Sequence, residues 1–460
     1  MADSDMTLPV ALVGDEMRVP RIGGEDRRYT NLDAAASTSA LPAVAKRVDD
    51  FLPWYSSVHR GAGYKSRRAT IAYEQARAAF LRFAGRREGT DDVAIICRNT
   101  TEAINILAYR LRLDDDDVVA TTVVEHHANL LPWARVARRR FVECDRHGTF
   151  AVDDVIAALD AEPRPKLLAL TGASNVTGWM PPIGEIVRAA HERGVPVFLD
   201  AAQLAPHLPF PATDFVAWSG HKMYAPFGAG ALVGPRHAFA AGDPFLFGGG
   251  AVDLVDLDEV VWTEPPEREE AGSPNVIGAV AMHAAIDELT RIGWDAIAEH
   301  DREIARQLRA GLAALPRVQL LGPDPDETTL PLATFNISGM HHALVAARLS
   351  VEYGIGVRHG CFCAHPYLVR LLDLTPDELT EYHQAVARGD RRAIPGAVRA
   401  SAGLSTSAAD IDYLLAAVSD LVDGKPAPTT YTQDRTGDFA PAEPGWYGDD
   451  ENLGAPCAPG

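Results

Sequence analysis

Two ionisable side chains at the ends of apolar runs could together carry out carbonyl chemistry. Lys222 lies in Ser219-Gly220-His221-Lys222, after the run DFVAWSG and before a glycine-rich stretch. A lysine amine that its surroundings partly deprotonate can form an imine with an aldehyde. Asp200 ends the run VPVFLD, and a buried carboxylate there suits a protonated pyridine nitrogen, which makes the ring an electron sink. Taken singly, each has an ordinary alternative: a surface lysine, and an aspartate that caps the helix AAQLAPH.

A second group of polar residues could bind the phosphate and the ring of a cofactor. Asn99-Thr100-Thr101-Glu102 lies between a predicted strand and a predicted helix, where free N–H groups and the helix dipole favour an anion. His126 follows another strand, and its imidazole could lie flat on an aromatic cofactor. An ordinary threonine cap and a satisfied polar histidine are the alternatives. No GxxxxGK[ST] loop is present, which disfavours a nucleotide-triphosphate enzyme.

Cys363 is a candidate nucleophile. It lies in the segment RHGCFCAHP, whose glycine and proline indicate a loop. Arg358, His359 and His365 nearby could favour its thiolate, the reactive form of the thiol. A small buried hydrophobic residue is the alternative interpretation. Cys361, two residues earlier, is the rival for the role of nucleophile.

The elements that position these residues read as strands alternating with helices. Apolar runs at 93–98, 118–124, 166–174, 195–200, 214–220 and 230–234 are separated mainly by amphipathic or helical segments. This pattern predicts a mainly parallel sheet covered on both faces. Ligands of such sheets bind outside the carboxyl ends of the strands, where the residues above are found.

The length of 460 residues predicts more than one domain. We expect an N-terminal segment (1–28), a large α/β domain (29–296), a smaller α+β domain (297–424) and a disordered or wrapping tail (425–460). Five scattered cysteines do not suggest a disulfide framework, and no cluster has the spacing of a zinc site.

The net charge of −20 argues against nucleic acid or an anionic membrane as the main partner. No apolar run is long enough for a membrane helix, and the N-terminus carries acids where a secretory signal carries bases. The sequence therefore predicts a cytoplasmic protein.

The motifs together resemble the class V aminotransferase family of pyridoxal 5′-phosphate (PLP) enzymes, in its SufS-type cysteine desulfurase and selenocysteine lyase branch. The resemblance runs from about Tyr29 to Leu421. The segments that carry it, in order, are Leu32-Asp33-Ala34-Ala35, Val58-His59-Arg60-Gly61, Thr100-Thr101-Glu102, Glu125-His126-His127-Ala128-Asn129, Ser174-Asn175, Asp200-Ala201-Ala202-Gln203, Ser219-Gly220-His221-Lys222, Glu270-Ala271-Gly272-Ser273-Pro274-Asn275 and Arg358 to Pro366.

The resemblance implies PLP fold type I, the aspartate aminotransferase-like fold, with a mostly parallel seven-stranded sheet and a smaller C-terminal α+β domain. It implies that Lys222 holds the cofactor as a Schiff base and moves the Cα proton of the substrate. The cofactor contacts that it implies are Thr100, Thr101, His126, Asn175, Asp200, Gln203, Ser219, His221, Lys222 and Ser273, the last from the second subunit of a homodimer. The substrate contacts that it implies are Asn175 and Arg399, with Arg358 and His59 close by.

The implied reaction converts L-cysteine to L-alanine and leaves the sulfur as a persulfide on Cys363, for delivery to an acceptor protein. Lys222, Cys363 and His126 are the implied catalytic residues, and no metal is involved. The choice between sulfur and selenium, and the identity of the acceptor, stay open at this stage.

Three departures from the family pattern bear on these expectations. Cys361-Phe362 replaces the usual histidines, Ser273 replaces the usual threonine, and 35 residues separate Cys363 from Arg399, more than is usual. The insertion could reshape access, dock a partner or have no role. The alternative functions are an epimerase, a transaminase or a C–S lyase that uses no loop thiol, and a catalytically silent protein of the same fold.

Overall fold

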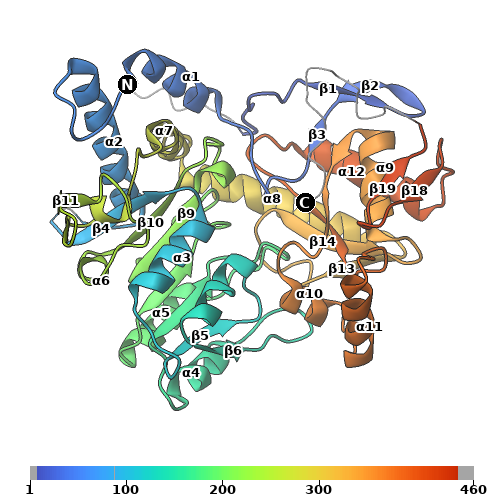
Figure 1. Cartoon of the computed structure of the whole chain (residues 1–460). Helices are drawn as coiled ribbons and strands as arrows, with labels where there is room; N and C mark the ends of the chain where they lie inside the picture. The colour runs from blue at the N-terminus through green and yellow to red at the C-terminus, as the bar shows by residue number, and fades with distance from the viewer. Residues whose placement is uncertain (1–7, 88, 444–460) are drawn as a thin grey trace.

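The computed structural model describes residues 8–87 and 89–443, and its centre is a seven-stranded sheet (Figure 1). In spatial order the strands are β4 (Asp92–Cys97), β10 (Gly230–Pro235), β9 (Phe215–Ser219), β8 (Val197–Asp200), β7 (Leu167–Thr171), β5 (Val118–Thr122) and β6 (Arg138–Val142). Strand β10 runs antiparallel to both neighbours, and the pairs from β9 to β6 are parallel. The predicted fold class is confirmed.

The sheet is covered on both faces because its central strands are apolar on both sides. Every residue of β5, β7, β8 and β9 is buried. Leu168 and Leu170 of β7 belong to one core cluster, whereas Leu167 and Ala169 belong to the cluster on the other face. This alternation is the two-residue period of a strand acting between two apolar layers.

Helices from different parts of the chain form these two layers. One layer contains α1 (Pro42–Phe51), α2 (Tyr64–Phe83), α4 (Val152–Asp160), α5 (Ile183–Glu192) and α7 (Val276–Ile292). The opposite layer contains α3 (Thr100–Arg110), α6 (His237–Ala240) and the 3-10 turn η3 (Pro132–Arg135). Other 3-10 turns are η1 (Leu52–Trp54), η2 (His127–Asn129), η4 (Gly220–Lys222) and η5 (Glu267–Glu269).

A second, antiparallel sheet has the order β13 (Val318–Leu321), β14 (Leu332–Ile337), β17 (Ala397–Ser401) and β16 (Arg358–Gly360). It packs with α8 (Trp294–Ala314), α9 (His342–Tyr353) and α12 (Ala408–Val422) around a separate apolar core. Strand β3 (Thr30–Asn31) pairs with β15 (Ile355–Gly356), which ties the early chain to this C-terminal part.

The remaining elements are short or peripheral. They are the hairpins β1 (Arg18–Arg21) with β2 (Gly24–Arg28), β11 (Val252–Val255) with β12 (Val260–Trp262), and β18 (Tyr431–Gln433) with β19 (Phe439–Pro441), and the helices α10 (His365–Leu371) and α11 (Pro376–Ala387). Helix α11 lies in the stretch between Cys363 and Arg399 and has no buried residue.

The β18–β19 hairpin makes up much of the described part of the predicted tail. Gln433 donates to the carbonyl of Arg392, and Asp438 lies 3.3 Å from His359. Residues 444–460 lie outside the described residues, and the predicted domain boundaries stay a prediction. Among the described helices, none combines the length and apolarity that crossing a membrane requires.

Candidate active site

A cavity of about 210 Å³ opens at the carboxyl ends of β7, β8 and β9. Three elements of the C-terminal part close it: β16, the loop that follows β16, and β17. The cavity brings together most of the predicted site residues, namely Thr100, Thr101, His126, Asn175, Asp200, Gln203, Ser219, His221, Lys222, Arg358, Cys363 and Arg399.

Lys222 follows β9 at the end of η4, and its side chain opens onto the cavity. Protein atoms surround the amine, and burial lowers its pKa from the ordinary 10.5 to about 8. The carboxylate of Asp200 opposes this shift, whereas Arg399 adds to it. A substantial fraction of the amine is therefore uncharged just above neutral pH, as attack on an aldehyde requires.

Asp200 ends β8 as a buried carboxyl group beside the cavity. Burial raises its pKa, while the N–H of Ala202, 3.0 Å from Oδ1, and the charge of Lys222 lower it. A cation placed in the cavity would favour the ionised form further. Gln203 also faces the cavity, and its Nε2 donates to the carbonyl of Ala35 at 2.8 Å.

The N-terminus of α3 forms the anion-binding end of the cavity. Asn99 caps the helix by accepting the N–H of Glu102 at 3.0 Å. The N–H of Thr100 donates to Ser219 Oγ at 2.8 Å, which joins α3 to the end of β9. A Cβ on Gly230 would lie 2.7 Å from Asn99 Cα, so this close approach of β10 requires glycine. Thr100, Thr101 and Ser219 line this end of the cavity beside the positive end of the helix dipole, which favours a phosphate.

His126 is held as a neutral ring. Burial, followed by the charge of Lys222, lowers its pKa to about 3. Its Nδ1 accepts the N–H of Ala128 at 3.0 Å, which leaves the proton on Nε2. His221 is similar, because burial and Lys222 lower its pKa to about 4. A neutral imidazole can lie against an aromatic ring without placing a charge on it.

Glu125 positions the loop that carries His126, a role that was not predicted. Its fully buried carboxyl group accepts hydrogen bonds from Thr122 Oγ1 at 2.9 Å, Asn129 Nδ2 at 2.7 Å and the N–H of Thr171 at 2.9 Å. Burial raises its pKa to about 8. Glu125 belongs to one of the motifs that carry the family resemblance, but these contacts depend on the pairing of β5 with β7, which the sequence does not show.

Three consecutive carbonyl groups hold the loop after β16 in place. Asn175 Nδ2 donates to the carbonyl of Phe362 at 2.7 Å, and the N–H of His127 donates to that of Cys363 at 2.7 Å. The carbonyl of Cys361 accepts the N–H of Ala364 at 3.0 Å. Asn175, predicted to bind substrate and cofactor, therefore already uses its amide group on this loop.

The same loop has an unusual backbone. Phe362 and Cys363 have φ of 54° and 53°, in the left-handed region, and Gly360 has a φ of 105°. Such conformations cost non-glycine residues roughly 1–3 kcal/mol each, and the carbonyl hydrogen bonds offset this cost. The Cys363 side chain is exposed and lines the cavity, whereas Cys361 is half-buried against the core and does not.

Arg399 is a buried cation at the opposite wall. It donates to the carbonyl of Asn175 at 2.7 Å and to Asp33 Oδ1 at 3.0 Å, and Asp33 also lies 3.6 Å from Arg358. The Nε of Arg399 is buried and has no hydrogen-bond partner among the described residues. A carboxylate in the cavity would satisfy it. The sequence predicts no role for Asp33, which lies 366 positions from Arg399.

These groups fit PLP. The cavity offers an amine of lowered pKa for the aldehyde, a buried carboxylate for the ring nitrogen and a capped helix N-terminus for the phosphate. The aldehyde, the ring nitrogen and the phosphate of PLP would therefore each meet a group of matching chemistry.

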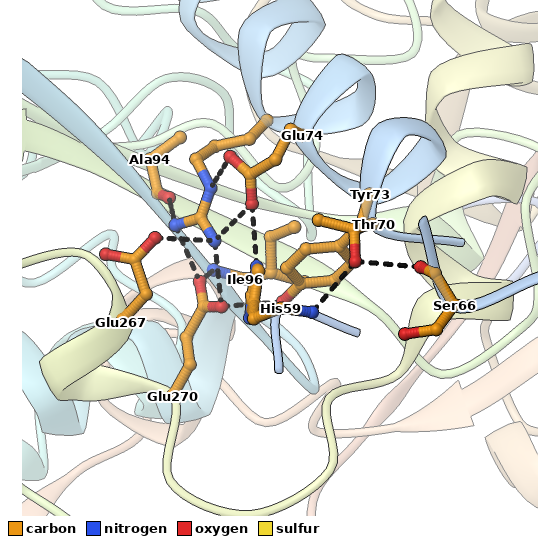
Figure 2. A network of polar contacts seen from close by, with 10 residues as sticks. His59, Ser66, Thr70, Tyr73, Glu74, Ala94, Ile96, Glu267 and Glu270 are labelled. Atoms are coloured by element: carbon orange, nitrogen blue, oxygen red, sulfur yellow. Dashed lines mark hydrogen bonds and ion pairs between the residues drawn. The ribbon is translucent and has the colours of Figure 1, made fainter. Parts of the chain in front are cut away.

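The structure does not bring His59 and Ser273 into this cavity. Both line a second cavity beside the β11–β12 hairpin. There His59 Nε2 lies 2.9 Å from Glu74, within a network of polar residues on α2, β4 and the segment 267–270 (Figure 2). The role of Ser273 in a second subunit stays a prediction.

The centre of this network is the buried pair of Arg77 and Glu270, of which Figure 2 labels Glu270. Arg77 also lies 3.2 Å from Glu74 and 3.9 Å from Glu267. Ligand atoms of His59, Glu74 and Glu267 come within 4.8 Å of one another. However, the Arg77 guanidinium already supplies the positive charge between the carboxylates, so we assign no metal to them.

Comparisons with known proteins agree with the geometry. A family model described as "Aminotransferase class-V" matches residues 30–414. The "Cysteine desulfurase" of Dickeya dadantii is 36% identical over 363 residues, which cover 76% of this chain and 86% of the relative. The "Probable cysteine desulfurase" of Halalkalibacterium halodurans is 36% identical over 357 residues, which cover 75% and 86%. The apo structure of a cysteine desulfurase from Thermococcus onnurineus NA1 is similar, with 30% identity, a TM-score of 0.76 and coverage of 86% and 95%.

Proposed function

Because the chain belongs to the aminotransferase class-V family, we propose that it is a PLP-dependent cysteine desulfurase. It converts L-cysteine to L-alanine and leaves the sulfur as a persulfide on Cys363. The observation that carries the proposal is that one cavity holds both the Lys222 amine and the exposed Cys363 thiol. An epimerase or a transaminase has no use for that thiol.

When bound, PLP supplies an aldehyde for Lys222 and for the substrate amine, and a ring that accepts electrons from the substrate Cα. Asp200 would pair with the ring nitrogen, and the neutral His126 would lie against the ring. Thr100 and Thr101 at the start of α3 would hold the phosphate, together with Ser219 at the end of β9 and with His221. Gln203 would contact the ring oxygen.

Lys222 is the proton carrier in this proposal. Its pKa of about 8 allows the amine both to accept a proton from the substrate Cα and to return one near neutral pH. Arg399, with its unsatisfied Nε, would bind the substrate carboxylate, assisted by Asn175 and Arg358. These contacts turn the Cα proton toward the lysine, which is the positioning that the reaction needs.

Cys363 is the sulfur acceptor. Its thiolate attacks the substrate sulfur, so that a bond forms between the two sulfurs and the bond from sulfur to Cβ breaks. The electron pair stays on carbon, which takes up a proton, and the product leaves as alanine. The exposed position of Cys363 also leaves the persulfide within reach of an acceptor protein.

We further propose a cytoplasmic homodimer in which His59 and Ser273 face the cofactor of the partner subunit. Two features support it: these residues line a cavity separate from that of Lys222, and the adjacent β11–β12 hairpin exposes apolar side chains. The exposed side chains are Leu254, Val255, Leu257, Val260 and Val261. Apolar groups gathered in this way on a surface mark a protein contact.

The test is incubation of the holoprotein with L-cysteine, followed by measurement of alanine and of the persulfide trapped on the Cys363 peptide while the reaction proceeds. Cys363→Ser should form no persulfide, whereas Cys144→Ser, a control at a half-buried thiol outside the cavity, should behave as the wild type. Pyruvate and sulfide in place of alanine, or alanine at the wild-type rate from Cys363→Ser, would contradict the proposal.

A further inference from the structure

Two thiols lie on the same turn after β16. Cys361 and Cys363 are both free and are separated by Phe362, whose side chain is buried. Residues two apart lie at most about 7 Å from each other at Cα, and the turn closed by Cys361 and Ala364 shortens this. Disulfides span about 4.4–6.8 Å between Cα atoms, so the chain allows a bond between these two residues.

The other described cysteines are poor candidates for sulfur chemistry. Burial raises the pKa of Cys97, which lies inside β4. Burial also raises the pKa of Cys144 to about 11. Both therefore stay protonated near neutral pH, and the thiolate is the reactive form. Among the described thiols, Cys361 is the one that lies nearest to Cys363 along the chain, on the same loop.

The held backbone of the loop limits how far Cys363 can carry a persulfide. The carbonyls of Phe362 and Cys363 accept hydrogen bonds from Asn175 and His127, which lie in the segments that follow β7 and β5 of the central sheet. The buried Phe362 ring anchors the same turn, with the Arg399 guanidinium 5.2 Å from its centre. A persulfide formed there stays beside Cys361 until an acceptor arrives.

We propose that Cys361 is a resolving thiol, which releases the sulfur of the Cys363 persulfide as sulfide; this rests on the proposed function. The Cys361 thiolate attacks Sγ of Cys363. A bond forms between the two cysteine sulfurs, and the bond from Cys363 Sγ to the outer sulfur breaks. The outer sulfur leaves with the electron pair and takes up the proton that Cys361 released.

The electrons balance within this step. The Cys361 sulfur is oxidised and the outer sulfur is reduced to sulfide, while the Cys363 sulfur keeps the oxidation level that it reached in the persulfide, so no external oxidant is needed. Hydrogen sulfide is more acidic than a cysteine thiol, so the hydrosulfide anion is a better leaving group than a cysteine thiolate. The disulfide then blocks a second turnover until a reductant restores both thiols. Sulfide release is thereby coupled to reducing power.

The test is a single turnover of the holoprotein with one equivalent of L-cysteine and no added reductant. Alanine, sulfide and the mass of the peptide that carries both cysteines are measured. The wild type should release one sulfide for each alanine, and its peptide should lose two hydrogen atoms. Cys361→Ser should retain an additional sulfur on Cys363 and release sulfide about tenfold more slowly. Cys144→Ser should match the wild type.

The inference is overturned if the wild-type peptide keeps an additional sulfur and releases no sulfide, or if Cys361→Ser releases sulfide as fast as the wild type. Cys361→Ala is a second variant, and the wild-type peptide mass decides the question if neither variant folds. If the wild type forms no alanine, the proposed function itself is refuted. If it forms alanine but no sulfide, only the proposed role of Cys361 is refuted.

Discussion

Replacing Glu270 by alanine should destabilise the protein by about 3 kcal/mol, because it leaves a buried guanidinium without its main partner. The Glu270 carboxylate accepts hydrogen bonds from Tyr73 Oη at 2.6 Å and from the N–H of Ile96 at 2.7 Å. It also accepts two from Arg77, at 3.2 and 3.3 Å. Breaking a buried pair costs roughly 3–5 kcal/mol, and the contact of Arg77 with Glu74 places this case at the lower end.

The assay is urea unfolding of the holoprotein, followed by tryptophan fluorescence, for Glu270→Ala, Arg77→Met and the double variant. Because the two residues share one interaction, the double variant should cost well below the sum of the single variants, with a coupling of about 2 kcal/mol. Single costs under about 1 kcal/mol that add to within about 0.5 kcal/mol would refute the reasoning. Lys46→Ala, at an exposed pair with Asp50, is a control expected to change stability by under about 1 kcal/mol.

Two further predictions concern the cavity. Capture of PLP by the apoprotein, followed by the absorbance of the imine, should become faster as pH rises through about 8, because the uncharged amine of Lys222 is the reactive form. Asp200→Asn should move that midpoint to lower pH, since its carboxylate raises the pKa of Lys222; an unchanged midpoint would contradict this assignment. Arg399→Lys should raise KM for L-cysteine roughly 10- to 100-fold with a smaller change in kcat, because lysine cannot reproduce the guanidinium contacts. Steady-state kinetics check this, and a loss confined to kcat would be inconsistent with a binding role.

The central strands could be predicted because they are buried on both faces, so that their apolar runs stand out in the sequence. Strand β6 could not, because the segment 126–139 reads as one of the amphipathic or helical segments between strands. It contains η2, η3 and the start of β6. Strand β6 begins with three arginines and is exposed or half-buried except at its last residue, since it lies at the edge of the sheet and pairs only with β5. Edge strands commonly carry charge, which hides their periodicity.

The site was predictable where a residue follows a strand. Lys222 and Asp200 stood out because each ends an apolar run, and the sheet then brings the two together. Asp33 and Glu125 gained their roles only from tertiary contacts, which no local pattern encodes. His59 is predicted from its motif to lie beside the substrate, but within one chain it lines a separate cavity.

The segments that form the two walls of the cavity are synthesised at different times. The wall with Lys222 and Asp200 needs β10 and the covering helix α7, so it can assemble once residue 292 has left the ribosome. Arg399 lies on β17, more than 100 residues later, and its partner Asp33 is made near the start of synthesis. The nascent chain therefore acquires the elements for capturing an aldehyde before those for selecting an amino acid.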